Sequence, residues 1–99
     1  MGSLSDLFIT APRPTRDQLA EADPDMLFAD GFDDALVGYA EMYGRPLLAA
    51  YDRLKCIDIL MTRDGMTYDG AVEFFEFNVL GGWVGEYTPI FLTLGTDLH

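Results

Sequence analysis

The chain has 99 residues, 49% of them hydrophobic, and its 17 acidic and six basic side chains give a net charge of −11. This length suits one compact domain, and the apolar content is too high for an intrinsically disordered chain. The shortage of Lys and Arg excludes direct nucleic-acid binding, while the acidic balance and the lack of a run of about 20 apolar residues exclude a membrane function.

The first 30 residues predict an arm with one or two short helices. Residues 15–18 have the residue types of a capping box, which opens a helix that continues to about Ala22. Asp23 followed by Pro24 offers a second helix start, with proline at the first helical position. We therefore divide the chain into an N-terminal arm, residues 1–30, and a single small domain, residues 31–99.

Two short apolar runs, residues 35–40 and 46–51, predict the strands of a β-hairpin. Gly44 lies in the connection between them, where a tight turn favours glycine. Pro46 lacks a backbone donor and so belongs at the start of the second strand.

Two helices are predicted after the hairpin. Asp52 predicts the cap of an amphipathic helix that ends near Gly65. Thr67 begins the next helix, which ends at a pair of glycines and carries an apolar stripe along one face. The stripe consists of Tyr68, Ala71, Val72, Phe75 and Val79. Phe74 and Phe77 lie outside it, and we expect them to widen the buried face rather than to contact a partner.

Residues 88–94 predict a last strand, with Pro89 near its start. The order of elements after the arm is then strand, strand, helix, helix, strand. A three-stranded sheet covered by the two helices would bury both apolar stripes. The predicted fold class is therefore α+β, with an antiparallel-type sheet made of the hairpin and the C-terminal strand.

The acidic side chains are concentrated where cations are missing, because no Lys or Arg occurs between Arg16 and Arg45. The eight carboxylates of this cation-free stretch are those of Asp17, Glu21, Asp23, Asp25, Asp30, Asp33, Asp34 and Glu41. The negative electrostatic field of these carboxylates repels anionic partners and attracts basic protein surfaces.

Several sequence blocks occur in a fixed order through the predicted domain. They include GFDDA at residues 31–35, DGMTY at 64–68, AVEFFEFN at 71–78 and WVGEYTP at 83–89. Together these blocks resemble a family of small uncharacterised proteins that is common in bacteriophages and prophages. The resemblance does not extend to the arm, residues 1–30, and the family has no catalytic motif that could be transferred to this chain. It implies a phage-like setting in which small acidic proteins bind host machinery, as anti-CRISPR proteins and DNA mimics do by analogy.

Residues that could carry catalysis are sparse. The one histidine, His99, lies at the C-terminal end of the chain, which argues against a fixed Cys-His pair. Cys56 falls on the apolar stripe of its helix, where we expect a buried and unreactive thiol. Asp33 and Asp34 are adjacent residues directly before the first predicted strand. In extended backbone their side chains would point to opposite faces, so they would not act together as an acid and a base. We therefore expect no enzyme activity.

A metal site is not expected either. The chain lacks the several Cys and His residues of a zinc site, and its acids do not have the spacing of an EF-hand loop. Weak calcium binding by the clustered carboxylates is the alternative to a solvated acidic face. We expect no cofactor.

The first functional hypothesis is an interaction protein whose acidic face occupies a basic surface of a host protein. It would bind and inhibit a nucleic-acid-handling complex, such as a Cas-type effector, by nucleic-acid mimicry. The single cysteine and the absence of a signal-peptide pattern indicate the cytoplasm of the host cell. The predicted partner-binding residues are Asp23, Asp25, Asp30, Asp33, Asp34 and Glu41, with Glu73 and Glu76 as a second patch.

The second hypothesis is a small-ligand-binding or enzyme accessory domain. Its pocket would lie between the sheet and the helices, near Trp83, Glu86 and Tyr87. A further alternative is a homodimer that pairs the exposed edge of the hairpin or the surface of Phe74 and Phe77.

Overall fold

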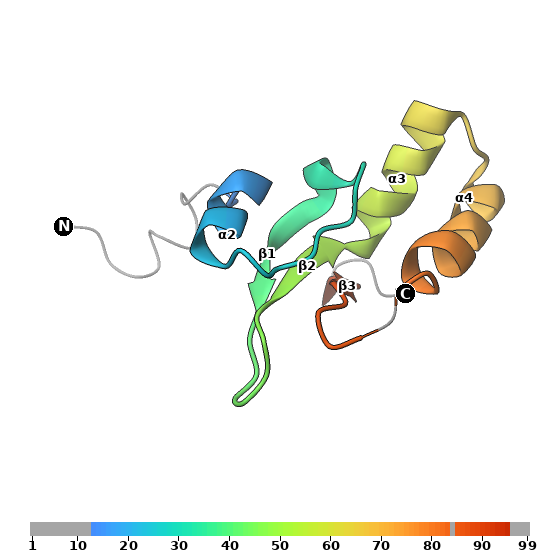
Figure 1. Cartoon of the computed structure of the whole chain (residues 1–99). Coiled ribbons are helices and arrows are strands. Elements are labelled where there is room, and N and C mark those ends of the chain that lie inside the picture. The colour runs from blue at the N-terminus through green and yellow to red at the C-terminus, as the bar shows by residue number, and fades with distance from the viewer. Residues whose placement is uncertain (1–12, 84, 96–99) are drawn as a thin grey trace.

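The structure, a computed structural model, describes residues 13–83 and 85–95 (Figure 1). Its elements are helix α2 (Arg16–Ala22), the 3-10 helix η1 (Asp33–Ala35), strands β1 (Leu36–Ala40) and β2 (Leu48–Asp52), helices α3 (Arg53–Asp64) and α4 (Tyr68–Phe74), the π-helix η2 (Phe75–Leu80) and strand β3 (Ile90–Leu92). The α+β class and the predicted order of strands and helices are confirmed. Helix α2 lies on one side of the strands, and the pair α3 and α4 lies on the other (Figure 1).

The three strands form one sheet in the order β1-β2-β3. β1 and β2 pair antiparallel, with Tyr39 opposite Ala49, as the predicted hairpin requires. β3 pairs parallel to β2, with Phe91 opposite Tyr51. The prediction of an antiparallel-type sheet is therefore wrong for the third strand.

The path of the chain between η2 and β3 sets the direction of β3. Arg53 at the start of α3 lies 3.1 Å from Glu76 in η2, so the two helices form a hairpin that returns the chain to the end of β2. The next segment then reaches the other end of the sheet, where Glu86 lines a groove with Met42 and Arg45 of the hairpin connection. Because β3 starts from that end, it runs parallel to β2.

The predicted N-caps at Thr15, Asp52 and Thr67 are confirmed. The Thr15 hydroxyl accepts a hydrogen bond from the Gln18 amide, and the Gln18 side chain accepts one from the Thr15 amide, which completes a capping box. Asp52 caps α3, and Thr67 caps α4, each by accepting a bond from a backbone amide in the first turn. Gly65 ends α3 with a φ of 70°, which glycine adopts without strain.

Asp23 and Pro24 do not start a second helix in the described chain. The Asp23 carboxylate accepts a hydrogen bond of 3.1 Å from the Asp25 amide, and a turn forms at residues 24–25. Aspartate stabilises such a turn by bonding to the backbone two residues ahead, and this local bond replaces a helical one.

The core contains a cluster of three aromatic rings from three elements. Tyr51 of β2 and Phe75 of η2 are fully buried. The ring of Phe91 in β3 stacks on Tyr51 at a centroid distance of 5.5 Å and meets Phe75 edge-on at 5.2 Å. Such pairs add about 0.5–1.5 kcal/mol to the burial of the rings themselves, so they hold the short strand β3 in the sheet.

The same core includes residues from the predicted arm. Leu19 of α2, and Met26 and Ala29 after it, are buried in one hydrophobic cluster with the strands and the helices. The predicted boundary at residue 30 therefore does not separate an arm from the core, and the segment from α2 onward is packed on the domain.

The prediction that Phe77 widens the buried face of its helix is wrong. It is 74% exposed, and Phe74 is 38% exposed. Phe77 follows the buried Phe75 by two positions, which is about half a turn of the helix, so its side chain lies on the side away from Phe75. In η2 the Gly81 amide donates a 2.9 Å bond to the Glu76 carbonyl, and a Cβ on Gly81 would lie 2.9 Å from that oxygen, so glycine is required there.

Candidate functional site

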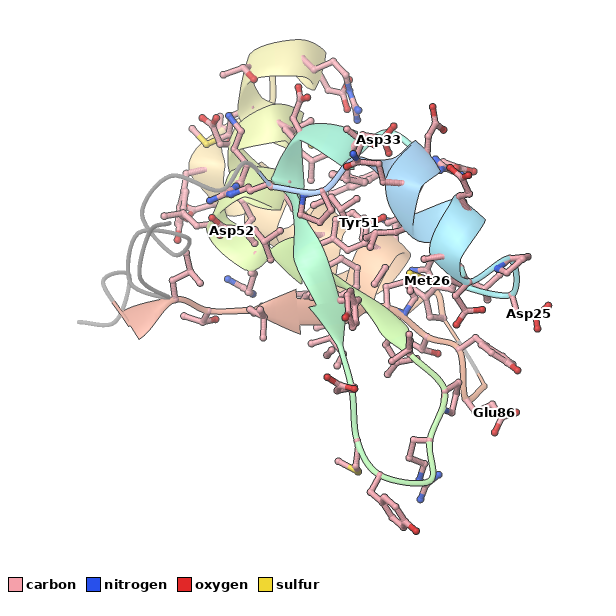
Figure 2. The ribbon with its side chains drawn as sticks, turned by 90° about the vertical axis from the view of Figure 1, so that its left-hand side faces the viewer. Asp25, Met26, Asp33, Tyr51, Asp52 and Glu86 are labelled. Atoms are coloured by element: carbon pink, nitrogen blue, oxygen red, sulfur yellow. The ribbon has the colours of Figure 1, made fainter. Side chains whose placement is uncertain are left out.

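The eight acids predicted to bind a partner do not form one continuous surface. Figure 2 shows Asp33 beside α2 and Asp25 at the turn that follows this helix. Helix α4 and η2 lie on the other side of the sheet (Figure 1), and Glu41 follows β1 into the hairpin connection. The structure therefore places Asp23, Asp25, Asp30, Asp33 and Asp34 on the α2 side and separates them from Glu41, Glu73 and Glu76.

Arg16, at the edge of the cation-free stretch, is held by two of the predicted binding acids. Its guanidinium lies 2.8 Å from the Asp30 carboxylate and 3.5 Å from that of Asp33, and it stacks over the Phe28 ring at 5.0 Å. The hydrogen bond to Asp30 is the main reason that the pKa of Arg16 is raised. Asp30 and Asp33 are thus engaged within the fold, which leaves less of their charge for a partner.

The outward side of α2 carries Asp17 and Glu21, two acids that are not among the predicted partner-binding residues. Asp17 and Glu21 are exposed and lie one helical turn apart, and Asp25 is exposed just after the helix. Within residues 13–83 and 85–95, none of the three has a cation within ion-pair distance. We call Asp17, Glu21 and Asp25 the α2 acidic face. Because the capping box already predicted a helix here, the four-residue spacing of Asp17 and Glu21 was the signal for this face.

Asp33 and Asp34 lie in the 3-10 helix η1 and not on a strand. Both line a groove of about 370 Å³ toward α2, which includes Arg16, and a groove of about 410 Å³ toward α3, which includes Lys55 and Arg63. Cations therefore lie on both sides of this acidic pair, and the local charge is mixed.

The two acids of the second predicted patch, Glu73 and Glu76, have different surroundings. Glu76 forms an ion pair with Arg53 at 3.1 Å, and the Arg53 guanidinium stacks over the buried Phe75 ring at 5.3 Å. Glu73 is exposed on α4. Glu76 therefore joins η2 to α3, and Glu73 is the member of this patch that faces solvent.

The predicted ligand pocket near Trp83 and Glu86 is not one cavity. Trp83 lines a groove of about 290 Å³ with Phe32 and Val79, whereas Glu86 lines a separate groove of about 370 Å³ with Glu41 of the hairpin. These two side chains therefore do not converge on a common ligand.

A larger open groove, of about 440 Å³, lies along α3. Its apolar lining residues are Leu54, Ile57, Met61, Tyr68 and Leu94. Tyr68 was expected in the buried stripe, but it is 53% exposed and lines this open groove.

The described residues include the candidate nucleophile, Cys56, and the clustered acids considered as metal ligands. Cys56 is fully buried, as expected, and burial together with the nearby Asp52 charge raises the pKa of its thiol to about 12. Among the described side chains, no group of three or more His, Cys, Asp or Glu converges as metal ligands do. His99 lies outside the described residues. None of the helices in this part of the chain has the length and apolar character needed to cross a bilayer.

Comparison with family models, with curated proteins and with solved structures found no match to this chain. The resemblance to small phage proteins stays a prediction.

Proposed function

We propose that this protein is an acidic interaction protein that binds a positively charged surface of a nucleic-acid-handling protein. The observation that carries the proposal is the α2 acidic face. Asp17 and Glu21 are exposed without a cation among the described residues, while neighbouring Arg16 is held by Asp30 and Asp33. The net charge of −11 adds a field that draws a basic partner toward the protein.

The spacing of the α2 acidic face supports competition with nucleic acid. Asp17 and Glu21 are one turn apart, so they are separated by about 6 Å along the helix axis. Two base-pair steps of DNA advance about 7 Å along the duplex axis. A basic groove built for phosphates can therefore meet the carboxylates at similar intervals.

The resemblance to phage proteins suggests the kind of partner. In a phage-like setting, a host complex that binds nucleic acid, such as a Cas-type effector, is the first target to examine. The protein would inhibit it in an anti-CRISPR-like manner, by occupying the groove and excluding the nucleic acid. The alternative of a small-ligand domain has less support, because Trp83 and Glu86 line different grooves.

The test uses purified Cas effector complexes carrying fluorescently labelled DNA or guide RNA. The protein is titrated in, and displacement is followed by anisotropy. We expect displacement at about 50 mM salt and steep weakening toward about 500 mM, because salt screens exposed charges. Displacement that does not change with salt contradicts mimicry, and no displacement from any effector contradicts the choice of target.

A pair of charge-matched variants locates the binding surface. Asp17→Asn with Glu21→Gln removes two charges from the α2 acidic face, and Glu41→Gln with Glu86→Gln removes two from the hairpin groove. We expect only the first variant to weaken displacement, by about 0.2–1 kcal/mol for each exposed ion pair lost. Equal weakening by both variants would mean that the partner responds to net charge alone.

A further inference from the structure

The outer side of α4 and η2 carries a line of exposed side chains. Asp69, Glu73 and Phe77 follow one another at four-residue intervals, so they lie along one side of the helix. All three are exposed, and Phe77 is the most exposed aromatic side chain on either helix segment, at 74%. We call Asp69, Glu73 and Phe77 the α4 outer row.

Two further apolar side chains flank Phe77. Phe74 lies three residues before it and is 38% exposed, and Leu80 lies three residues after it and is 47% exposed. Asp69 and Glu73 make no ion pair with any cation in the described ranges. The helix therefore presents an apolar patch at one end of the row and two unneutralised carboxylates at the other.

Residues next to the α4 outer row attach its helix to the rest of the fold. Glu76, next to the row, is paired with Arg53, and Phe75 is fully buried beneath it. Phe77 itself lies in the π-helix η2. π-helical turns are rare in proteins and occur frequently at functional sites. The row is thus displayed by a helix that is held against α3 and not by a loop.

The acids in the row decide which partner fits it. A second copy of this chain would bring another protein of net charge −11 against this surface, and its own Asp69, Glu73 and Phe77 would offer no cation to these carboxylates. An anionic membrane is repelled for the same reason. A basic amphipathic helix instead offers apolar side chains to Phe77 and cations to the carboxylates.

We propose that the α4 outer row, with Phe74 and Leu80 beside Phe77, docks a basic amphipathic helix of a partner protein. The partner helix lies along α4 and η2, with its apolar stripe on the aromatic patch and its Lys or Arg side chains over Asp69 and Glu73. The axes of two packed helices lie about 8–10 Å apart, and at this distance such side chains are in contact. This surface is separate from the α2 acidic face and does not depend on the function proposed above.

The test uses the full chain and two synthetic peptides of identical Leu and Lys composition, each long enough for about four helical turns. In one peptide the leucines recur at helical spacing and form a stripe, and in the other the order is scrambled so that no stripe exists. Binding is measured by fluorescence anisotropy of the labelled peptide. We expect the striped peptide to bind at least about tenfold more tightly than the scrambled one, since only it can bury Phe77.

Four variants test whether the peptide binds at this surface, two of them within it and two elsewhere. Phe77→Ala is expected to weaken the striped peptide about five- to thirtyfold, as loss of a central aromatic contact does. Glu73→Lys is expected to weaken it about fivefold or more, and to flatten its salt dependence. The matched control is Tyr43→Ala, which removes a fully exposed ring from the hairpin connection and should leave binding unchanged. Asp17→Asn with Glu21→Gln should also leave it unchanged, which separates this proposal from the previous one.

Circular dichroism confirms that each variant is folded, and light scattering gives the mass of the wild-type protein. The proposal is overturned if both peptides bind equally, because the attraction is then only between net charges. It is overturned if Phe77→Ala binds as the wild type does. It is also overturned if the wild type is a dimer that Phe77→Ala converts to a monomer, because the patch then pairs with a second copy.

Discussion

The hydroxyl of Tyr51 in β2 accepts a hydrogen bond of 2.8 Å from the backbone amide of Ala29. Both residues are buried, and Figure 2 shows Tyr51 in the interior of the molecule. The bond joins the central strand of the sheet to the segment that follows α2. It therefore fixes the place of the α2 acidic face on the domain, and it satisfies a backbone donor that has no water available in the core.

Removal of the Tyr51 hydroxyl is expected to destabilise the protein. Tyr51→Phe keeps the ring but leaves the Ala29 amide buried without an acceptor, which costs about 1–3 kcal/mol. Urea unfolding followed by circular dichroism measures the loss as a lower midpoint with an unchanged slope. Tyr43→Phe, at a fully exposed ring, is the control and should change stability by less than about 0.5 kcal/mol.

Truncation of Leu19 tests whether the N-terminal segment belongs to the core. Leu19 is 5% exposed, so Leu19→Ala is expected to cost about 2–5 kcal/mol in the free energy of unfolding. The control is Leu27→Ala, where the side chain is 43% exposed and the expected cost is below about 1 kcal/mol. Equal, small effects at both positions would show that residues before 30 form a separate arm.

Stability is expected to fall at alkaline pH because of Cys56. In the fold its thiol pKa is raised to about 12, whereas in the unfolded chain it is about 8.5. Above pH of about 8.5 the unfolded state therefore binds fewer protons than the native state, and stability falls as the pH rises toward 12. The slope approaches about 1.4 kcal/mol per pH unit, and burial also raises the pKa of Tyr51, which acts in the same direction above a pH of about 10.

Urea titrations at a series of alkaline pH values measure this slope. Cys56→Ala removes the titrating group, so its stability should decline less steeply than that of the wild type over the same range. Parallel declines in the two proteins would argue against the contribution of Cys56. Alkylation of the native thiol should likewise be slow, because the side chain is fully buried.

Asp30 and Asp33 are expected to affect stability differently from the α2 acidic face. Asp30→Asn with Asp33→Asn leaves Arg16 without its ion-pair partners and is expected to cost up to about 1 kcal/mol at low salt, since these carboxylates are exposed. Asp17→Asn with Glu21→Gln breaks no ion pair within the described residues and should stay within about 0.5 kcal/mol of the wild type.

Thermal unfolding at low and high salt measures both effects. The cost of the Asp30 and Asp33 double variant should shrink at high salt, because ions screen the pair in the wild type as well. A salt-independent cost would assign the effect to packing around Arg16 rather than to its charge.

Local features of the fold could be predicted because they depend on neighbouring residues alone. The caps at Asp52 and Thr67 and the helix end at Gly65 need only a side chain or a glycine within one turn of the backbone. The hairpin followed from two apolar runs with a glycine between them, and the buried Cys56 followed from helical periodicity.

The candidate site was predicted only in part, because charge count does not reveal which charges are already paired. The acidic stretch was visible in the sequence, but Arg16 reaches Asp30 and Asp33 across 14 and 17 positions, a contact that only folding creates. Asp17 and Glu21 belong to the same acidic stretch but were not among the predicted binding residues. They have no cation within the described fold, and their importance appeared once Arg16 was seen to be engaged elsewhere.

By itself, the sequence determined the sign of the protein's field, the positions of the helix ends and the α+β class, because composition and short-range hydrogen bonding set these properties. Only the tertiary structure decided the direction of β3, the union of Leu19 with the core and the exposure of Phe77. These depend on the path of the chain through space and on which side of each element meets another, and periodicity along one segment does not contain that information.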